Sequence, residues 1–444
     1  MPSSAPDSPR RRIFSVPARA LRLARPLAWL LGAAYFAFVL LVLVLRYAVM
    51  PHVADYRGDL ERALSATLHL PVAVAAVEGD WQGLRPKLVL HKLQIRDSAG
   101  RPALSFDHVE AVLAWSTLFH LEPRLHLLGV DAPVLDIRRD AAGRLFVAGL
   151  AVDTGDTRPG FADWLLRQNH LAVSDATVTW TDEMRAAPPL TLSHVNLVVD
   201  NGGSRHRFGL TAEPPGHLAE KLDLRGDLHG RDLAAPDRWR GELYVDLPRT
   251  DLAVWRTWID YPVELPRGHG ALRLWLDFAA LRPTAVTADV ALDGVSVRLA
   301  PELPMLELGN LSGRLQFAHE GDAWQVATRR LALATADGVA IAPADVSLRW
   351  HSHGGEFSAT RLDLGDLLRL SAHLPLAEPV RRELDRYAPR GRLRNCTFTW
   401  GGDAQHPFRR YRIEGSFDGL TLSPGGAIPG VAGLSGSIAG DQAG

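Results

Sequence analysis

The sequence predicts a mainly β protein with a few short helices and one transmembrane helix near its N-terminus. Three observations favour this fold class. An uncharged apolar run lies at Leu27–Leu45, apolar and polar residues alternate in many later segments, and glycine (39) and proline (30) can supply many turns. Alternation with a period of two gives a strand one apolar and one polar face, as in antiparallel sheets.

The apolar run Leu27–Leu45 forms a helix of roughly 28 Å, which matches the hydrocarbon thickness of a bilayer. Residues 1–26 hold six arginines and one acidic residue, Asp7, which orients the N-terminus toward the cytoplasm. The alternative is a cleaved signal peptide, but the run is longer than usual and no clear cleavage site follows it. We expect an uncleaved, single-pass anchor, with lipid contacts that include Leu27, Trp29, Leu31, Phe36, Leu41 and Leu45.

Composition excludes some classes of protein. The chain has 444 residues and a net charge of −1, so nothing in its overall charge attracts nucleic acid. Its hydrophobic fraction of 47% and charged fraction of 22% are typical of a folded protein. The single cysteine, Cys396, cannot form an internal disulfide, and we interpret it as a small buried apolar residue rather than a reactive thiol.

The order of these patterns predicts the organisation of the chain. Helical spacing occurs at Asp55–His69, Phe161–Asn169, Thr250–Ile259 and Glu378–Tyr387. We expect an arginine-rich cytoplasmic tail (1–26), a membrane anchor (27–48) and a membrane-proximal helix (51–70). A first β module (71–150), a linker with an amphipathic helix (151–170) and a repeated β region (171–444) follow.

The alternating segments supply candidates for an apolar lining. Trp180, Trp350 and Trp400 end three such runs; we expect them to cap the apolar face of a sheet, and lining a channel for an apolar ligand is the alternative. Alternation does not distinguish an open groove from the filled core of a β-sandwich, and both interpretations stay open. The candidates for a lipid groove are Val178, Trp180, Leu272, Leu274, Leu276, Val286, Val290, Leu348, Trp350 and Phe398.

An internal repeat indicates a sheet extended by similar units. The segment Leu292–Val297 (LDGVSV) is similar to Phe417–Leu422 (FDGLTL), and each precedes a Leu-Ser-Gly unit, at Leu311–Gly313 and Leu434–Gly436. Recurrence in a fixed order is typical of elongated repeat architectures. Because the second copy opens just before Gly444, we expect the chain to be a portion of a longer protein.

A search for catalytic chemistry finds no complete constellation. The sequence has no P-loop, no G-x-S-x-G elbow and no H-E-x-x-H helix, so we predict that the protein is not an enzyme and has no cofactor. His351 and His353 place two imidazoles on one face of a strand, but no third metal ligand is suggested nearby. The acidic pair Asp182 and Glu183 follows a strand, and we interpret it as a solvated turn.

Five segments in order carry a resemblance to a known family. They are Val77–Pro86 (VEGDWQGLRP), Pro133–Asp140 followed by Gly143–Leu145, Trp164–Gln168, Trp180–Asp182 and Gly309–Gly313. This collinear set resembles the YhdP branch of the AsmA-like superfamily over nearly the whole chain. The resemblance implies an elongated, curved antiparallel β-sheet groove with an apolar inner surface, reaching from the inner toward the outer membrane. It also implies a role in phospholipid transport between the membranes and in outer-membrane integrity.

Two functional hypotheses follow. The first is a lipid conduit, anchored in the bacterial inner membrane with its bulk in the periplasm, whose partners are phospholipid, the inner membrane and outer-membrane or envelope proteins. The second is a scaffold for outer-membrane proteins, in which open strand edges pair with client strands. Co-purifying lipid would favour the conduit, and crosslinks to outer-membrane protein precursors would favour the scaffold.

Overall fold

In the computed structural model, the chain forms one long sheet that is preceded by a helical N-terminal segment. The structure describes residues 18–68, 70–96, 102–117, 124–148, 150–151, 168–231, 236–402, 409–425 and 429–443. The amphipathic helix expected at Phe161–Asn169 lies almost wholly outside the described residues.

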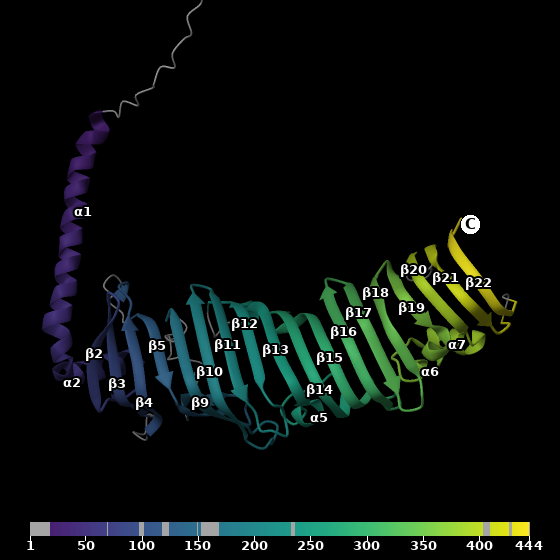
Figure 1. The fold of residues 1–444 in the computed structure, drawn as a ribbon, viewed down its shortest axis with the longest axis horizontal. Helices are drawn as coiled ribbons and strands as arrows, with labels where there is room; N and C mark the ends of the chain where they lie inside the picture. The colour runs from purple at the N-terminus through teal and green to yellow at the C-terminus, as the bar shows by residue number, and fades with distance from the viewer. Residues whose placement is uncertain are drawn as a thin grey trace, which may run out of the picture.

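The N-terminal helix is continuous through several helical types. The α-helix α1 (Ala18–Val44) continues into a π-helical turn η1 (Leu45–Val49), a 3-10 segment η2 (Met50–Tyr56) and the α-helix α2 (Arg57–Leu68). Among the described residues, one helix is long and apolar enough to cross a membrane, and it lies in this segment. Figure 1 shows α1 at a steep angle to the long axis of the sheet, beside its first strands.

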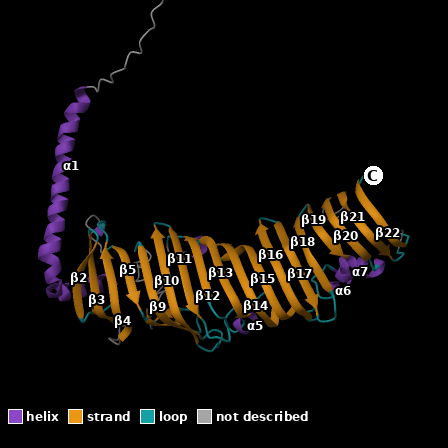
Figure 2. Ribbon diagram, viewed as in Figure 1, coloured by secondary structure: helices purple, strands orange, loops and turns teal. Residues whose placement is uncertain are grey.

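All described strands belong to one sheet. Figures 1 and 2 show them side by side along the long axis of the molecule. The strands are β1 (Val72–Ala73), β2 (Ala76–Gln82), β3 (Arg85–Arg96), β4 (Pro102–Leu113), β5 (Leu125–Asp131), β6 (Val134–Arg139), β7 (Leu145–Val147), β8 (Leu150–Ala151), β9 (His170–Asp182), β10 (Leu190–Gly202), β11 (Arg205–Glu213), β12 (Leu222–His229), β13 (Arg240–Asp251), β14 (Glu264–Ala279), β15 (Arg282–Arg298), β16 (Leu306–Glu320), β17 (Ala323–Thr335), β18 (Ala340–His351), β19 (Gly354–Asp363), β20 (Arg390–Gly401), β21 (Arg410–Leu422) and β22 (Val431–Asp441).

The topology is a long antiparallel meander with one parallel junction. From β9 to β22, each strand pairs antiparallel with the next in the chain. The junction lies at β9, where β5 and β6 both run parallel to it, one after the other along the same side. The interpretation as a two-sheet β-sandwich with a filled core is therefore wrong for the described residues, because they contain no second sheet to cover the apolar face.

The short helices mark one long side of the sheet, which we call the helix edge (Figure 2). The helix α5 (Leu252–Trp255) lies within the predicted Thr250–Ile259, and the Asp251 carboxylate caps it by accepting from the N–H of Ala253. The helix α7 (Glu378–Tyr387) has the predicted bounds. The helix α6 (Leu364–Ser371) was not among the helices expected from the sequence. The tight turns after β2, β10, β14, β16 and β18 lie on the opposite side, which we call the hairpin edge.

The hydrophobic core is concentrated at the N-terminal end and along the helix edge. At the N-terminal end, Met50 packs into a cluster formed by β1 to β5, which includes Leu90 and Val109. Along the helix edge, Leu252 and Leu370 pack against strand ends that carry Val295. These clusters hold the helices and the strand ends together, while the middle of each strand from β11 to β21 projects away from them.

Candidate functional site

One line of side chains crosses the entire sheet on a single face. Directly opposed residues of paired strands share a face, so the register can be followed from strand to strand. We call this line the apolar row. It consists of Gly79, Leu88, Ala111, Leu128, Leu171, Val199, Phe208, Gly226, Leu243, Leu276, Val286, Phe317, Val326, Leu348, Phe357, Phe398 and Ile413.

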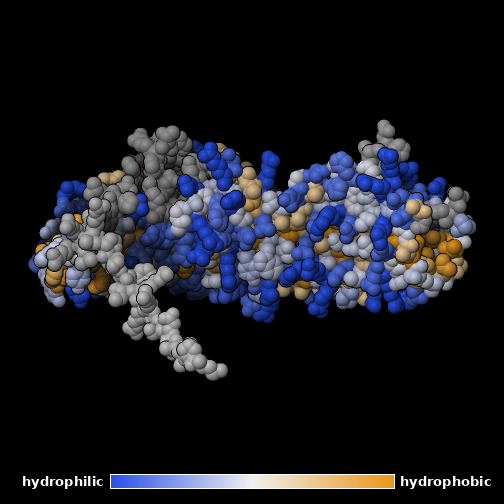
Figure 3. Space-filling model, turned by 90° about the horizontal axis from the view of Figure 1, so that it is seen from above, coloured by the Kyte–Doolittle hydropathy of each residue, from blue (hydrophilic) through white to orange (hydrophobic). Residues whose placement is uncertain are grey.

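The apolar row has no charged or polar side chain, and most of it is only half-buried. Phe317 is 36% exposed and Val326 is 40% exposed, whereas Val295, in the core at the helix edge, is 2% exposed. If a second layer covered the row in a filled core, its side chains would be as little exposed as that of Val295. Leu88, Ala111 and Leu171, at the N-terminal end of the row, are buried, and from Val199 to Ile413 every member is half-buried or exposed. This longer part of the row is therefore an apolar surface that the described residues leave open along the curved sheet. Figure 3, seen from above, shows apolar side chains scattered among hydrophilic ones along the body, with the largest apolar group at its right-hand end.

The opposite face of the same strands is charged and paired. Arg314 donates to Asp289 across β15 and β16, with 2.7 Å between Nη2 and Oδ2. Arg205 pairs in the same way with Asp227. The hydrogen bond from the Arg314 guanidinium lowers the pKa of the Asp289 carboxyl group. The two faces therefore differ sharply, since one suits water and the other suits hydrocarbon.

Bulges bend the strands near the helix edge. Lys92, Asp175, His194, Arg330 and Asn395 have φ between 47° and 54°, a left-handed conformation that non-glycine residues adopt at a cost. Asp175, His194, Arg330 and Asn395 each add a residue to their strand, so the apolar spacing changes locally from two to three and the apolar face is kept. At Lys92 the register of β3 with β4 is the same on both sides. For example, Val173 and Ala176 flank Asp175 and belong to the same cluster. The bulges thus separate the covered strand ends from the open apolar row.

The internal repeat in the sequence coincides with this bulge pattern. In Leu292–Val297 the bulge residue is Gly294, with φ of 58°, and in Phe417–Leu422 it is Gly419, with φ of 65°. Only glycine takes this conformation without strain from a Cβ atom. The Asp-Gly pairs of the repeat are therefore bend positions of equivalent strands.

The structure places the ten groove candidates as follows. Leu276, Val286, Leu348 and Phe398 are members of the apolar row. Leu272, Leu274 and Val290 lie on the same face but nearer the helix edge, two or four residues along the strand from the row member of β14 or β15. Trp350 lies two residues beyond Leu348 on the same face, nearer the hairpin edge and directly opposite Trp324. Val178 and Trp180 lie on this face beyond the bulge of β9. All ten are half-buried.

The three tryptophans chosen from the sequence lie at two different edges. Trp350 and Trp400 are on the apolar face at the hairpin edge, where Trp350 stacks on Trp324 with 6.3 Å between ring centroids. Trp180 is at the helix edge and packs against the cluster that contains Trp255. The rim of the apolar face at the hairpin edge is therefore aromatic from β17 to β20.

The anchor candidates lie on α1 and the turn that follows it. Leu27, Trp29, Leu31 and Phe36 are between 58% and 81% exposed, and Leu41 and Leu45 are half-buried. A soluble protein would not leave large apolar side chains bare over successive helical turns. The exposed surface of α1 therefore has the character of a helix surrounded by lipid.

The interpretation of Asp182 and Glu183 as a solvated pair is wrong for Asp182. Its side chain is only 1% exposed and forms a two-point pair with the guanidinium of Arg139, in which Nε donates to Oδ1 at 2.9 Å. The hydrogen bond from Arg139 holds the pKa of this carboxyl group below its usual range. Arg139 is the β6 residue opposite Asp182 in the parallel pair, so the ion pair joins the two strands at the parallel junction.

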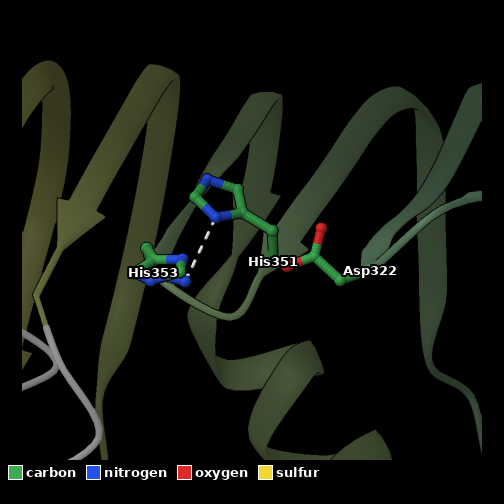
Figure 4. A group of neighbouring side chains, drawn as sticks. All are labelled: Asp322, His351 and His353. Carbon is green, nitrogen blue, oxygen red and sulfur yellow. Dashed lines mark hydrogen bonds between the residues drawn. The ribbon is translucent and has the colours of Figure 1, made fainter.

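The two histidines of the β18–β19 turn have a third neighbour that the sequence did not suggest. Asp322, in the turn between β16 and β17, lies beside His351 and His353, with one ligand atom from each of the three within 4.8 Å of the others (Figure 4). All three side chains are exposed, and Asp322 accepts from the N–H and the hydroxyl of Ser352 at 3.2 and 2.6 Å. This hydrogen bonding joins two neighbouring hairpin tips.

Comparison with known proteins gives one match that covers nearly the whole chain. Neither the curated proteins nor the solved structures that were compared include a significant match. The family model of the YhdP protein matches residues 18–444, which include α1 and every strand of the sheet. The chain therefore belongs to the YhdP protein family.

Proposed function

We propose that this protein is anchored in the bacterial inner membrane and carries phospholipid along its apolar face toward the outer membrane, which supports outer-membrane integrity. Membership of the YhdP family, in the AsmA-like superfamily of lipid transport proteins, supports this assignment. The observation that carries it is the apolar row, which begins at Gly79 beside the end of the anchor and continues to Ile413 on β21.

The energetics of a lipid in water explain why such a surface is needed. Each CH₂ group kept from water is worth about 0.8 kcal/mol, so a two-chain lipid does not cross an aqueous gap unaided at a useful rate. The apolar face shields the acyl chains, while the headgroup stays in water at the open side. Because Val, Leu and Phe recur from strand to strand, the affinity changes little along the row, and no deep trap stops the lipid.

The anchor sets the proposed location. The arginines of residues 1–26 favour the cytoplasm, α1 crosses the inner membrane, and the sheet lies in the periplasm. No catalytic step and no cofactor belong to this proposal. The driving force for transport therefore has to come from a partner protein or from a lipid gradient.

The first test is lipid bound to the purified protein. We expect phospholipid to co-purify with the full chain and to be identified by mass spectrometry. The variants Leu274→Glu and Val290→Glu place a charge on the apolar face and should lose most of this lipid. The control Thr287→Glu adds the same charge on β15, on the other face between Val286 and Ala288, and should retain it.

Two outcomes would contradict the proposal. One is a well-folded protein, with the melting temperature of the wild type, that carries no phospholipid. The other is equal lipid loss in Thr287→Glu and Val290→Glu, because that result would mean that the bound lipid does not recognise the apolar face. Site-specific crosslinks to outer-membrane protein precursors would instead support the scaffold hypothesis.

A further inference from the structure

The N-terminal helix lies along the first β module and makes three contacts with it, two with β2 and one with Trp115, which follows β4. At the bottom, Gly79 is so close to Met50 that an added Cβ atom would lie 2.7 Å from the Met50 carbonyl oxygen. Above it, the Arg46 guanidinium lies over the Trp81 ring at 5.6 Å. Highest, the rings of Phe38 and Trp115 meet edge to face at 4.9 Å.

The register places an exposed apolar residue at the level of Trp115, which is itself half-buried. Lys87 lies opposite Val112, so the turn that precedes Lys87 and the residues that follow Val112 reach the same hairpin edge. That turn holds Leu84, whose side chain is 63% exposed. Leu84 and Trp115 are thus neighbouring apolar groups at the hairpin edge of the first β module.

The height of this edge can be measured against the anchor. Phe38 lies seven residues before Leu45, the last residue of the uncharged run, and a helix rises 1.5 Å per residue, so Phe38 is about 10 Å inside the apolar segment. Since Trp115 contacts Phe38, it lies at a similar depth. Arg46 and Trp81 lie just below, where arginine and tryptophan are favoured at a membrane interface.

We propose that the hairpin edge of the first β module, formed by Leu84 and Trp115, inserts with α1 into the far-side leaflet of the bilayer. The partner is the lipid bilayer itself. Arg85, next to Leu84, has a long side chain that can extend to the headgroups while its stem stays among apolar atoms. The protein then meets the membrane through a helix and a strand edge, rather than through the helix alone.

This insertion assigns a role to the segment Val77–Pro86, the first of the segments that carry the family resemblance. In it, Gly79 permits the close approach of η2, Trp81 receives Arg46, and Leu84 is the inserted group. The apolar row begins at Gly79, in the same β module, and its first members Leu88 and Ala111 are covered by the N-terminal core. The inserted edge therefore holds the start of the row at the membrane, and the row opens farther along the sheet, from Val199 onward. The inference rests on the membrane anchor and does not depend on lipid transport along the sheet.

The experiment measures the depth of single labels in a membrane. The full chain carries one cysteine, so Cys396→Ala gives a cysteine-free background. An environment-sensitive fluorophore is attached at Leu84→Cys, at Phe36→Cys as the anchor reference, and at Leu281→Cys. Leu281 is the matched control because it is also 63% exposed and lies in a turn of the hairpin edge, but far along the sheet.

Each labelled protein is reconstituted into vesicles of phosphatidylethanolamine and phosphatidylglycerol, with and without lipid that carries a nitroxide on its acyl chain. We expect the labels at Phe36 and Leu84 to lose most of their fluorescence to the nitroxide, and the label at Leu281 to keep it. An unquenched label at Leu84 beside a quenched label at Phe36 would overturn the insertion and leave the anchor intact.

The other outcomes are also decisive. If Phe36 is not quenched, the anchor and the insertion both fail. If Leu281 is quenched as strongly as Leu84, the whole hairpin edge lies on the membrane, and both the local insertion and the proposed bridge to the outer membrane are wrong. Equal melting temperatures of the three labelled variants exclude misfolding as the cause of any difference.

Discussion

The carboxylate of Asp175 and the imidazole of His194 meet at 2.6 Å between Oδ1 and Nδ1, and both residues are bulge residues of neighbouring strands. A bulge leaves a backbone N–H without its ladder partner. The side chain of Asn196 accepts from the N–H of Asp175 at 3.1 Å, so polar side chains on the outer face stabilise the bend. The bends of β9 and β10 are therefore coupled.

The first prediction concerns the ionisation of His194. The hydrogen bond and the negative charge of Asp175 raise the pKa of His194 above its ordinary value of 6.5. Because the folded-state pKa is raised, the stabilisation from this pair is fully present below about pH 6.5 and is lost as pH rises through the folded-state value. NMR titration of labelled histidine should show the raised pKa, and Asp175→Asn should remove it. An unchanged titration in Asp175→Asn would contradict the assignment.

The second prediction tests the bulge at Asn395. Its φ of 47° is tolerated by asparagine and glycine but disfavoured for a β-branched residue. Asn395→Val should lower the free energy of unfolding by about 1 to 2 kcal/mol, whereas Asn395→Gly should change it little. Urea unfolding followed by circular dichroism measures both. Equal destabilisation by the two variants would show that the side chain, and not the backbone conformation, matters here.

The third prediction concerns the buried pair at the parallel junction. Asp182→Asn should destabilise the protein by about 3 kcal/mol, because it leaves the Arg139 guanidinium without its counter-charge. The pKa of Asp182 is lowered in the folded state, so its contribution is present above the unfolded value near 4 and is lost as pH falls further. Unfolding midpoints measured against pH should show this loss in the wild type and not in Asp182→Asn.

A matched control for this pair lies next to it in the sequence. Glu183 pairs with Arg138, but both side chains are more than 40% exposed. Glu183→Gln should therefore cost much less than Asp182→Asn, since exposed pairs contribute little. Similar costs for the two variants would mean that burial does not distinguish these neighbouring ion pairs.

The fourth prediction concerns an obstacle on the apolar face that adds no charge. The ring of Phe208 lies over Gly226 and occupies the space that a Cβ atom would need. Gly226→Leu should push this ring outward into the proposed path of the acyl chains and reduce the amount of co-purified lipid. Gly209→Leu is the control, because a Cβ atom there meets nothing within 4 Å and Gly209 lies on the opposite face. Equal lipid content in the two variants would contradict a path over Phe208.

The sequence predicted most of the fold because the relevant signals are local. Alternation such as Val286, Ala288 and Val290 identified strands and their apolar faces, and the spacing in Glu378–Tyr387 identified α7. The missed helix α6 also had a local signal. Asp363 precedes leucines at helical spacing, and its carboxylate caps the helix by accepting from the N–H of Asp366 at 3.1 Å.

What the sequence did not predict depends on pairing between distant segments. The burial of Asp182 follows from its parallel partner Arg139, 43 residues away. The approach of Asp322 to His351 follows from the pairing of β17 with β18. A strictly alternating pattern also gives no sign of a bulge at Arg330, because the extra residue is defined only against the neighbouring strand.

The continuous register of the sheet has a geometric consequence. Neighbouring strands lie about 4.8 Å apart, so the sheet from β3 to β22 is on the order of 80 Å long, and every further hairpin would add about 10 Å. Length in this fold is therefore counted in whole strands. A gene that gains or loses one hairpin changes the reach of its product by a fixed step, so such a protein can be matched to the width of the compartment in which it works.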